Sequence, residues 1–222
     1  MTVAVPRQGA GVVALACAAQ FLVVLDVSVV NVALPSVQAA LGVDPAHVQW
    51  VVHAYTLVFA GLLLLGGRLA DLYGRKSVFL LGLTLFAVAS LVGGMACTPE
   101  LLIAARAAQG TGAALLAPAT LTLITTTFPP GPRRTRAVAT WTAVAVGGGA
   151  AGNVAGGLLT DLLSWRWVLL VNVPIGVLAV LAAVRVLPAD ARAGRWPRLD
   201  VPGAVSVTAG LTAITYGVTR AT

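Results

Sequence analysis

Residues 67–76 read Gly67-Arg68-Leu69-Ala70-Asp71-Leu72-Tyr73-Gly74-Arg75-Lys76, a short and charged stretch in an otherwise apolar part of the chain. The apolar runs on either side, residues 47–66 and 77–96, are each about 20 residues long, enough for a helix to cross a bilayer core of about 30 Å. Three basic residues lie in the stretch, and the positive-inside rule places such a loop in the cytoplasm. Residues 67–76 therefore predict a tight cytoplasmic turn between two spanning helices.

Two glycines and one acid give this turn its expected geometry. Gly67 and Gly74 have no Cβ, which allows a sharp turn or a close approach of neighbouring helices. Asp71 is expected to pair with Arg75 one turn along, or to reach a helix N-terminus elsewhere. A plain turn with anchoring charges remains the alternative.

The composition indicates an integral membrane protein. Of 222 residues, 59% are hydrophobic and 9% are charged, with a mean hydropathy of +0.95, whereas about a quarter of a soluble chain is charged. The net charge of +7 lies in the gaps between apolar runs, where membrane topology explains it without a nucleic-acid partner. The expected fold class is an all-α membrane bundle.

Seven apolar segments follow one another along the chain. The first is too long for the apolar core of a signal peptide and is interpreted as an uncleaved spanning helix. The segments cover about 12–35, 48–70, 77–97, 100–124, 136–160, 167–186 and 202–219.

The basic residues between these segments predict the orientation of the chain. The N-terminus and residues 68–76, 125–136 and 185–200 hold 11 of the 14 Lys and Arg residues, and the opposite loops hold only Arg166. This bias predicts a multi-pass protein of the cell membrane with a cytoplasmic N-terminus.

The charged turn also resembles a family signature. The pattern Gly67-x-Leu69-Ala70-Asp71-x-x-Gly74-Arg75-Lys76 is similar to the loop between helices 2 and 3 of the major facilitator superfamily, although Leu72 stands where that family often has a basic residue. The resemblance implies a conformational gating role for these residues, with Asp71 engaging a helix end in the other half of the transporter.

The first apolar segment contains Gln20, Asp26 and Asn31. An acid inside a membrane helix costs at least about 2.5–3.5 kcal/mol unless it faces protein or water, so Asp26 is expected to face a cavity or a basic partner. Gln20 and Asn31 share one face, where they either line a substrate cavity or form interhelical hydrogen bonds. The run from Leu25 to Pro35 resembles the helix 1 signature of drug exporters.

Gln49, His53 and Thr56 recur at i, i+4 and i+7 in the second segment. Residues at this spacing form a polar stripe on one helix face, which suits the lining of a substrate cavity. A lone intramembrane histidine is more often a hydrogen-bonding partner between helices than a proton carrier.

Arg106 is the one basic residue well inside a spanning segment, and Gln109, also a candidate for the lining of the substrate cavity, follows it on the same face. A guanidinium in hydrocarbon needs a partner or water, unless it snorkels to the surface. The pattern around Arg106 resembles the helix 4 motif associated with proton coupling. Helix lengths put Arg106 and Asp26 within about 5 Å in depth, so we expect them to communicate directly or through water; a static salt bridge is the alternative.

The fifth segment carries the pattern Gly148-x-x-x-Gly152-Asn153-x-x-Gly156-Gly157. Such small residues allow helices to contact backbone to backbone. The pattern resembles the antiporter signature in helix 5, although the family usually has proline at the position of Asn153.

A short linker after the sixth segment favours the fourteen-helix drug–proton antiporters within the superfamily. The predicted domains are a six-helix half at 1–186, a cytoplasmic linker at 187–200 and a seventh spanning helix at 201–222. Because the superfamily pairs two six-helix halves, the resemblance implies that the chain corresponds to an N-terminal half whose C-terminal half is missing. A fragment, a truncated reading frame and a half that associates with a partner all remain open.

The function implied by the resemblance is proton-driven export of a hydrophobic or cationic small molecule. The driving force is the proton gradient, with no cofactor, since no phosphate-binding Gly-Lys-Ser/Thr loop is present. Cys17 and Cys97 suggest neither a disulfide nor a metal site, and no catalytic constellation indicates an enzyme. The alternative is a membrane half or interaction subunit that transports nothing. The expected partners are the lipid bilayer, protons and the substrate.

Overall fold

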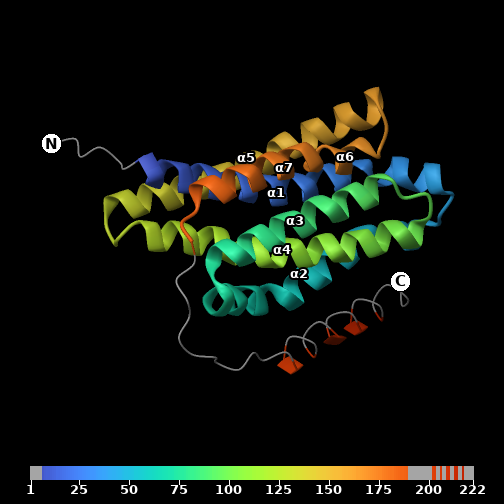
Figure 1. The fold of residues 1–222 in the computed structure, drawn as a ribbon. Helices are drawn as coiled ribbons and strands as arrows, with labels where there is room; N and C mark the ends of the chain where they lie inside the picture. Colours follow the sequence, from blue (N-terminus) through green and yellow to red (C-terminus); the bar gives the residue numbers. More distant parts are fainter. Residues whose placement is uncertain are drawn as a thin grey trace.

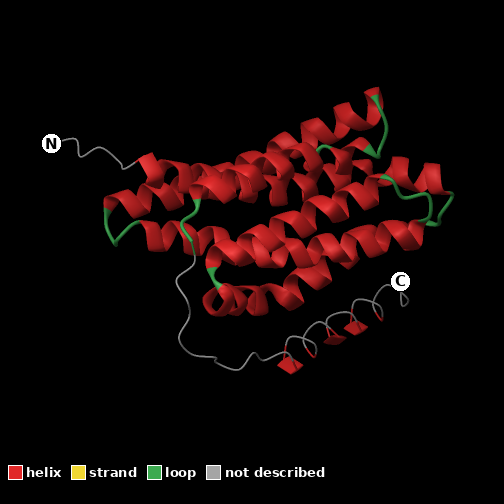
Figure 2. Ribbon diagram, viewed as in Figure 1, coloured by secondary structure: helices red, strands yellow, loops and turns green. Residues whose placement is uncertain are grey.

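The computed structural model describes residues 7–189 and, beyond them, residues 202–203, 206, 209–210, 213–214 and 217. Helices account for all the regular structure of residues 7–189, where no strand occurs (Figures 1 and 2). Residues 190–200, most of the predicted linker, and most of the predicted seventh span lie outside the described residues. The helices are α1 (Arg7–Leu41), α2 (Pro45–Tyr73), α3 (Arg75–Gly94), α4 (Pro99–Thr127), α5 (Pro132–Leu162), α6 (Trp167–Leu170) and α7 (Asn172–Val186).

Six spans are long and apolar enough to cross a membrane within the described part of the chain, with α6 and α7 together forming the span Trp167–Val186. They correspond to the first six predicted segments. Turn-forming residues mark several of their starts: Asp44 accepts a hydrogen bond from the backbone of His47 at 2.8 Å, and the Thr98 hydroxyl accepts one from Leu101 at 3.3 Å. These side chains satisfy backbone N–H groups that a helix start leaves without a partner.

The first helix was predicted to end near Pro35, and that boundary is wrong. Helix α1 continues through Pro35 to Leu41. A proline removes one backbone hydrogen bond, but membrane helices tolerate the loss where neighbouring segments support the chain. Val37 supplies that support, because it is buried in a cluster with Val48 of α2 and Trp165.

The predicted loop at 68–76 is also shorter than expected. Helix α2 runs to Tyr73 and α3 begins at Arg75, so only Gly74, with φ of 97°, separates them. Asp71 is exposed and makes no ion pair with Arg75 among the described residues. The spacing of the two suits a pair within one helix, but here they belong to different helices on either side of the glycine break.

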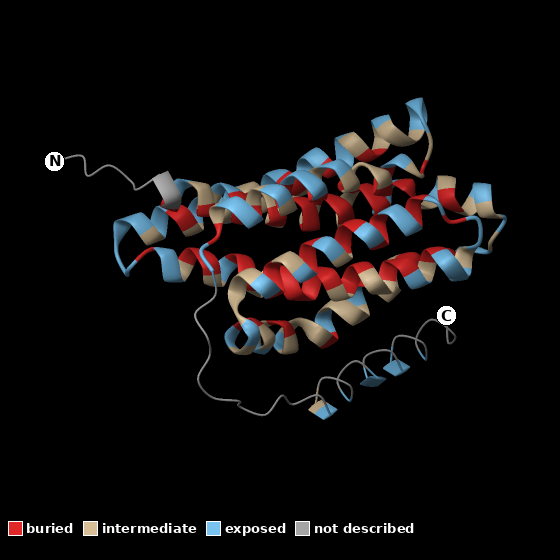
Figure 3. Cartoon of the chain, in the orientation of Figure 1, coloured by how far each residue is buried: buried red, intermediate tan, exposed pale blue. Residues whose placement is uncertain are grey.

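Helix α4 occupies the middle of the bundle, between α2 and α3, while α1 packs along α5 and α3 also contacts α7 (Figure 1). Small residues permit the closest approaches: a Cβ on Gly66 would lie 2.1 Å from the Ala114 carbonyl oxygen, and one on Gly112 would lie 2.8 Å from that of Gly82. Buried residues line the inner faces and exposed ones the outside (Figure 3). The outer surface is apolar, as at Leu64, which is 84% exposed, and this suits contact with lipid.

Three glycines of the predicted small-residue pattern form the contact between α5 and α1. Gly148, Gly152 and Gly156 are buried, and a Cβ on Gly152 would lie 2.6 Å from the Cβ of Ser28. Asn153 is exposed and Gly157 has nothing within 4 Å of the position of a Cβ. Only one face of the pattern therefore packs within the described bundle.

Candidate functional site

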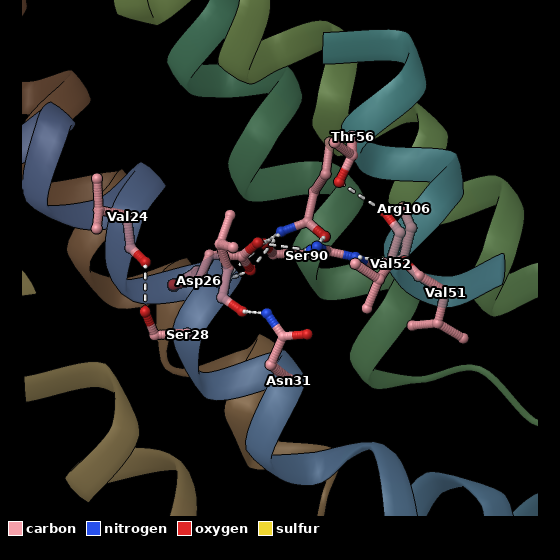
Figure 4. Close-up of polar contacts among 12 residues, drawn as sticks. Val24, Asp26, Ser28, Asn31, Val51, Val52, Thr56, Ser90 and Arg106 are labelled. Atoms are coloured by element: carbon pink, nitrogen blue, oxygen red, sulfur yellow. Dashed lines mark hydrogen bonds and ion pairs between the residues drawn. The ribbon is translucent and has the colours of Figure 1, made fainter. Parts of the chain in front are cut away.

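Asp26 of α1 and Arg106 of α4 meet in the interior of the bundle (Figure 4). Arg106 Nη1 lies 2.5 Å from Asp26 Oδ2, and the side chains of Arg106 and Asp26 are 1% and 0% exposed. The sequence analysis left open whether the two charges communicate directly or through water, and the structure places them in direct contact. Arg106 points inward and does not snorkel to the surface.

Two neutral amides complete the surroundings of the Asp26 carboxylate. Gln109 Nε2 donates to Asp26 Oδ1 at 3.0 Å, and Asn172 Nδ2 donates to the same oxygen at 2.7 Å. Both amides are buried, and each also donates to the hydroxyl oxygen of Ser90, at 2.5 Å and 3.4 Å respectively. Helices α1, α3, α4 and α7 therefore all contribute to one hydrogen-bond network, which we call the Asp26 cluster: Asp26, Ser90, Arg106, Gln109 and Asn172.

The guanidinium of Arg106 is held on three further sides. Its Nε donates to the Val51 carbonyl of α2 at 3.2 Å, and its Nη1 also donates to Gln109 Oε1 at 2.8 Å. The Tyr55 ring lies 4.4 Å from the guanidinium carbon and stacks on Phe59. A cation over an aromatic face is attracted by the ring electrons, so α2 contributes to the position of a charge carried by α4.

The hydrogen bonds of this arrangement suit the charged forms of Asp26 and Arg106. A buried ion pair is tolerated only when hydrogen bonds offset the loss of water around both charges, and the Asp26 cluster supplies these bonds to the carboxylate form. Protonation of Asp26 would remove the negative charge and leave Arg106 without its counter-ion. The two protonation states therefore differ in the electrostatic attraction between α1 and α4.

Sequence reasoning missed three members of this site: Ser90, Asn172 and Tyr55. Ser90 is one polar residue in an apolar helix, and Asn172 is one polar residue near the start of the apolar sixth span. Tyr55 is adjacent to Thr56 of the predicted polar stripe, but Tyr55 is buried whereas Thr56 is exposed. A search for polar residues inside each span would have found Ser90 and Asn172, although not their contact with Asp26.

The structure separates the residues that were predicted to line one substrate cavity. Gln109 is fully buried beside Asp26, whereas Asn31, Gln49 and Thr56 are exposed. Asn31 and Thr56 donate to carbonyls of their own helices, Val27 and Val52, at 2.8 Å and 3.0 Å (Figure 4).

The two remaining cavity candidates are half-buried. The His53 ring meets that of Trp50 edge-on at 5.9 Å between centroids, and Gln20 Oε1 is buried without a hydrogen-bond partner. A role in substrate binding stays a prediction for all of these residues.

The predicted gating residues divide into two groups. Gly67 and Asp71 line a hollow of about 740 Å³ that Arg68 and Pro118 also border. Lys76 instead donates from Nζ to the carbonyl oxygens of Val184 at 3.0 Å and Leu187 at 2.7 Å. Lys76 therefore ties the start of α3 to the end of α7.

The described residues contain no group of three or more His, Cys, Asp or Glu side chains placed to hold a metal ion, and Cys17 and Cys97 are both free thiols.

A family model and curated relatives both match nearly the whole length of the chain. Residues 16–217 match the family model of the Major Facilitator Superfamily. The chain is 61% identical over 208 residues to the cephamycin export protein CmcT of Amycolatopsis lactamdurans, covering 93% of this chain and 43% of that protein. It is 52% identical over 216 residues to the puromycin resistance protein pur8 of Streptomyces alboniger, covering 97% of this chain and 42% of that protein.

A solved structure shares the fold at low sequence identity. The crystal structure of a mutant of the peptide transporter POT in complex with sulfate superimposes with a TM-score of 0.73 at 15% identity, covering 97% of this chain and 46% of that one. The chain thus spans less than half the length of the relatives that it matches. The family match and the helical bundle agree: the chain belongs to the Major Facilitator Superfamily.

Proposed function

We propose that this protein exports antibiotic-like small molecules across the cell membrane in exchange for protons. The relatives CmcT and pur8 support export, because their names describe the export of cephamycin and resistance to puromycin. Within the superfamily, we expect the protein to belong to the fourteen-helix drug–proton antiporters. The chain would act as the N-terminal half of such a transporter, together with a C-terminal half.

The observation that carries the proton-coupling proposal is the fully buried ion pair between Asp26 and Arg106. Antiport requires a site whose occupancy by a proton changes the free-energy difference between two conformations. Protonating Asp26 cancels one charge of the pair and so changes how strongly α1 and α4 attract each other. Each proton that crosses a potential of 100 mV supplies about 2.3 kcal/mol to the cycle.

The apolar spans and the basic residues between them also support a transport cycle across the membrane. Six apolar spans make up the described bundle that holds the ion pair, and the basic residues between them support a cytoplasmic N-terminus and cytoplasmic ends of α2, α4 and α7. Two halves that rock about a central site give alternating access in this superfamily. The substrate would then bind between the halves, at the surfaces of α1 and α2 that carry Asn31, Gln49 and Thr56.

Transport in reconstituted vesicles tests this function. The protein, with any sequence that its gene encodes beyond Thr222, is placed in lipid vesicles that hold labelled puromycin or a cephamycin, and a pH gradient is applied. The proposal predicts drug movement that stops when the gradient is collapsed and that is lost in Asp26→Asn. Equal drug movement with and without the gradient would refute proton coupling. No movement of any tested drug by a correctly inserted protein would favour the alternative of a non-transporting membrane subunit.

A further inference from the structure

The Asp26 cluster surrounds the carboxylate with hydrogen-bond donors. Arg106 Nη1, Gln109 Nε2 and Asn172 Nδ2 all donate to Asp26. This arrangement suits an ionised carboxylate, which only accepts hydrogen bonds. A protonated carboxyl group also has an O–H to donate, and a buried donor without an acceptor is costly. A cluster that is to hold both forms therefore needs an acceptor within reach of Asp26.

Two of the three contacting side chains cannot supply that acceptor. Arginine has donors only. Gln109 has an acceptor, Oε1, but this atom already receives a hydrogen bond from Arg106 at 2.8 Å. Turning the Gln109 amide would break that bond and place its NH₂ group against the guanidinium.

Asn172 has the free acceptor. Its Oδ1 is buried and has no hydrogen-bond partner, while its Nδ2 lies 2.7 Å from Asp26 Oδ1. The two ends of an amide have nearly the same shape, so rotation by about half a turn about Cβ–Cγ exchanges donor and acceptor. With Asp26 ionised the reverse orientation would set one oxygen against another, which fixes the amide as observed.

We propose that Asn172 reads the protonation state of Asp26. Its Nδ2 donates to the carboxylate, and after Asp26 takes up a proton the amide rotates so that Oδ1 accepts the new O–H. Asn172 is thus a positioning residue for the coupling acid, and the inference rests on the proton-coupling role proposed above. The charged and titratable groups around Asp26 are Arg106 from α4 and Tyr55 from α2; α3 and α7 contribute the neutral Ser90 and Asn172.

Asn172 lies at the junction between α6 and α7, so rotation of its side-chain amide would act on that junction. Asn172 is the first residue of α7, directly after the break at Val171 that separates α6 from α7. The other end of α7 is held by Lys76 at the start of α3. A change of hydrogen bonding at Asn172 therefore acts on the junction between two helical segments of the sixth span, where the backbone is already interrupted.

Infrared difference spectroscopy with isotopically labelled asparagine side-chain carbonyls tests the rotation. Residues 1–222 contain three asparagines, Asn31, Asn153 and Asn172, and the band of each is identified by its loss when that asparagine is replaced. The protein is titrated in lipid vesicles. The carboxyl band that Asp26→Asn removes reports protonation of Asp26, and the labelled band that Asn172→Thr removes reports Asn172.

The expected result is a shift of the Asn172 band to lower frequency over the pH range in which the Asp26 carboxyl band appears, because a carbonyl that accepts a hydrogen bond vibrates more slowly. The bands of the exposed Asn31 and Asn153 should not follow it. An Asp26 band that appears while the Asn172 band stays fixed overturns the inference and leaves the proposed function intact. An Asp26 band that never appears overturns both.

Transport by a pair of variants separates this role from a purely structural one. Asn172→Leu keeps the approximate shape and removes donor and acceptor, and we expect proton-driven export to fall about tenfold. Asn172→Thr, whose hydroxyl both donates and accepts, should restore part of it. Thr120→Val is the control: it removes a half-buried interhelical hydrogen bond from Trp141 Nε1 at 3.2 Å that does not touch Asp26. A loss as large in Thr120→Val as in Asn172→Leu, or no rescue by threonine, would contradict the proposal.

Discussion

Individual residues decide whether two membrane charges are tolerated in this bundle. Asp26 and Arg106 are buried together, and both carboxylate oxygens of Asp26 and the Nε and Nη1 atoms of Arg106 have hydrogen bonds within the Asp26 cluster or to Val51. Removing one partner leaves the other as an uncompensated buried charge, which is more costly than losing the attraction alone.

Arg106→Gln should therefore destabilise the folded protein by about 3–5 kcal/mol. The measurement is thermal unfolding in detergent, followed by tryptophan fluorescence. Asp26→Asn combined with Arg106→Gln should cost less than Arg106→Gln alone, because no charge is left unpaired. Equal stability of Arg106→Gln and the wild type would show that the ion pair does not stabilise the folded protein.

The pairing of Asp26 with Arg106 could be predicted from the sequence, but the hydrogen-bond partners around the pair could not. Each charge needs a partner inside a membrane, and only one opposite charge lies at a similar depth. The supporting depth estimate assumed that the first helix ends near Pro35, whereas α1 extends to Leu41. Ser90 and Asn172 are common neutral residues whose roles depend on how α3 and α7 cross α1, and a single sequence does not encode those crossings in any local pattern.

At the scale of helices, glycines determine which faces come together. The sequence identified the small-residue pattern of α5, but it did not show which side would meet a partner. The structure assigns Gly148, Gly152 and Gly156 to the contact with α1, and leaves Gly147 and Gly157 open. Helix ends near proline or glycine were equally hard to predict, because tertiary contacts such as that of Val37 override local preferences.

Gly152→Ala is expected to destabilise the protein by about 1–3 kcal/mol, since the added methyl group would lie 2.6 Å from the Cβ of Ser28 and 2.9 Å from the Leu25 carbonyl oxygen. Gly147→Ala is the matched control on the same helix, with nothing within 4 Å of the added atom. It should be neutral or slightly stabilising because alanine favours helix. Similar thermal shifts for the two variants would rule out close packing of α1 on α5 at Gly152.

Lys76 links two helices that are far apart in sequence. Its ammonium group donates to two carbonyls at the end of α7, which otherwise lack helical partners. Lys76→Met should weaken this attachment by about 1 kcal/mol and speed hydrogen exchange in the last turn of α7. Arg68→Met, at an exposed basic residue of the same charged stretch, serves as the control. Faster exchange in both variants, or in neither, would contradict a specific role for Lys76.

The described helices form a bundle with an apolar outer surface, and the orientation of the chain was predicted from charge alone. The native thiol Cys97 is exposed and Cys17 is buried, so Cys97 reports one side of the membrane once Cys17 is replaced by serine. Cys97 is preferred to Thr98, whose hydroxyl caps α4. Ser77→Cys, with Cys97 also replaced, reports the other side. An impermeant thiol reagent added to intact cells should label Cys97 and spare residue 77, and the reverse pattern would invert the topology.

Six of the seven predicted spans and the family were also predicted correctly at this scale, because apolar length and charge position are properties of the chain itself. Most of the seventh predicted span lies outside the described residues. How the bundle opens depends on surfaces that only a complete transporter brings together. The central claim, that Asp26 and Arg106 couple protons to export, therefore has to be tested in the protein as its gene encodes it.

The most direct test is the charge-swapped variant, Asp26→Arg combined with Arg106→Asp, assayed for both folding and proton-driven drug export in lipid vesicles. The swap keeps an ion pair between α1 and α4 but moves the acid away from Asn172 and onto the other helix. The account predicts a protein that inserts and folds while drug movement no longer depends on the pH gradient. A swapped protein that folds and exports drug with the wild-type dependence on pH would show that the pair is a static salt bridge, and would contradict the account.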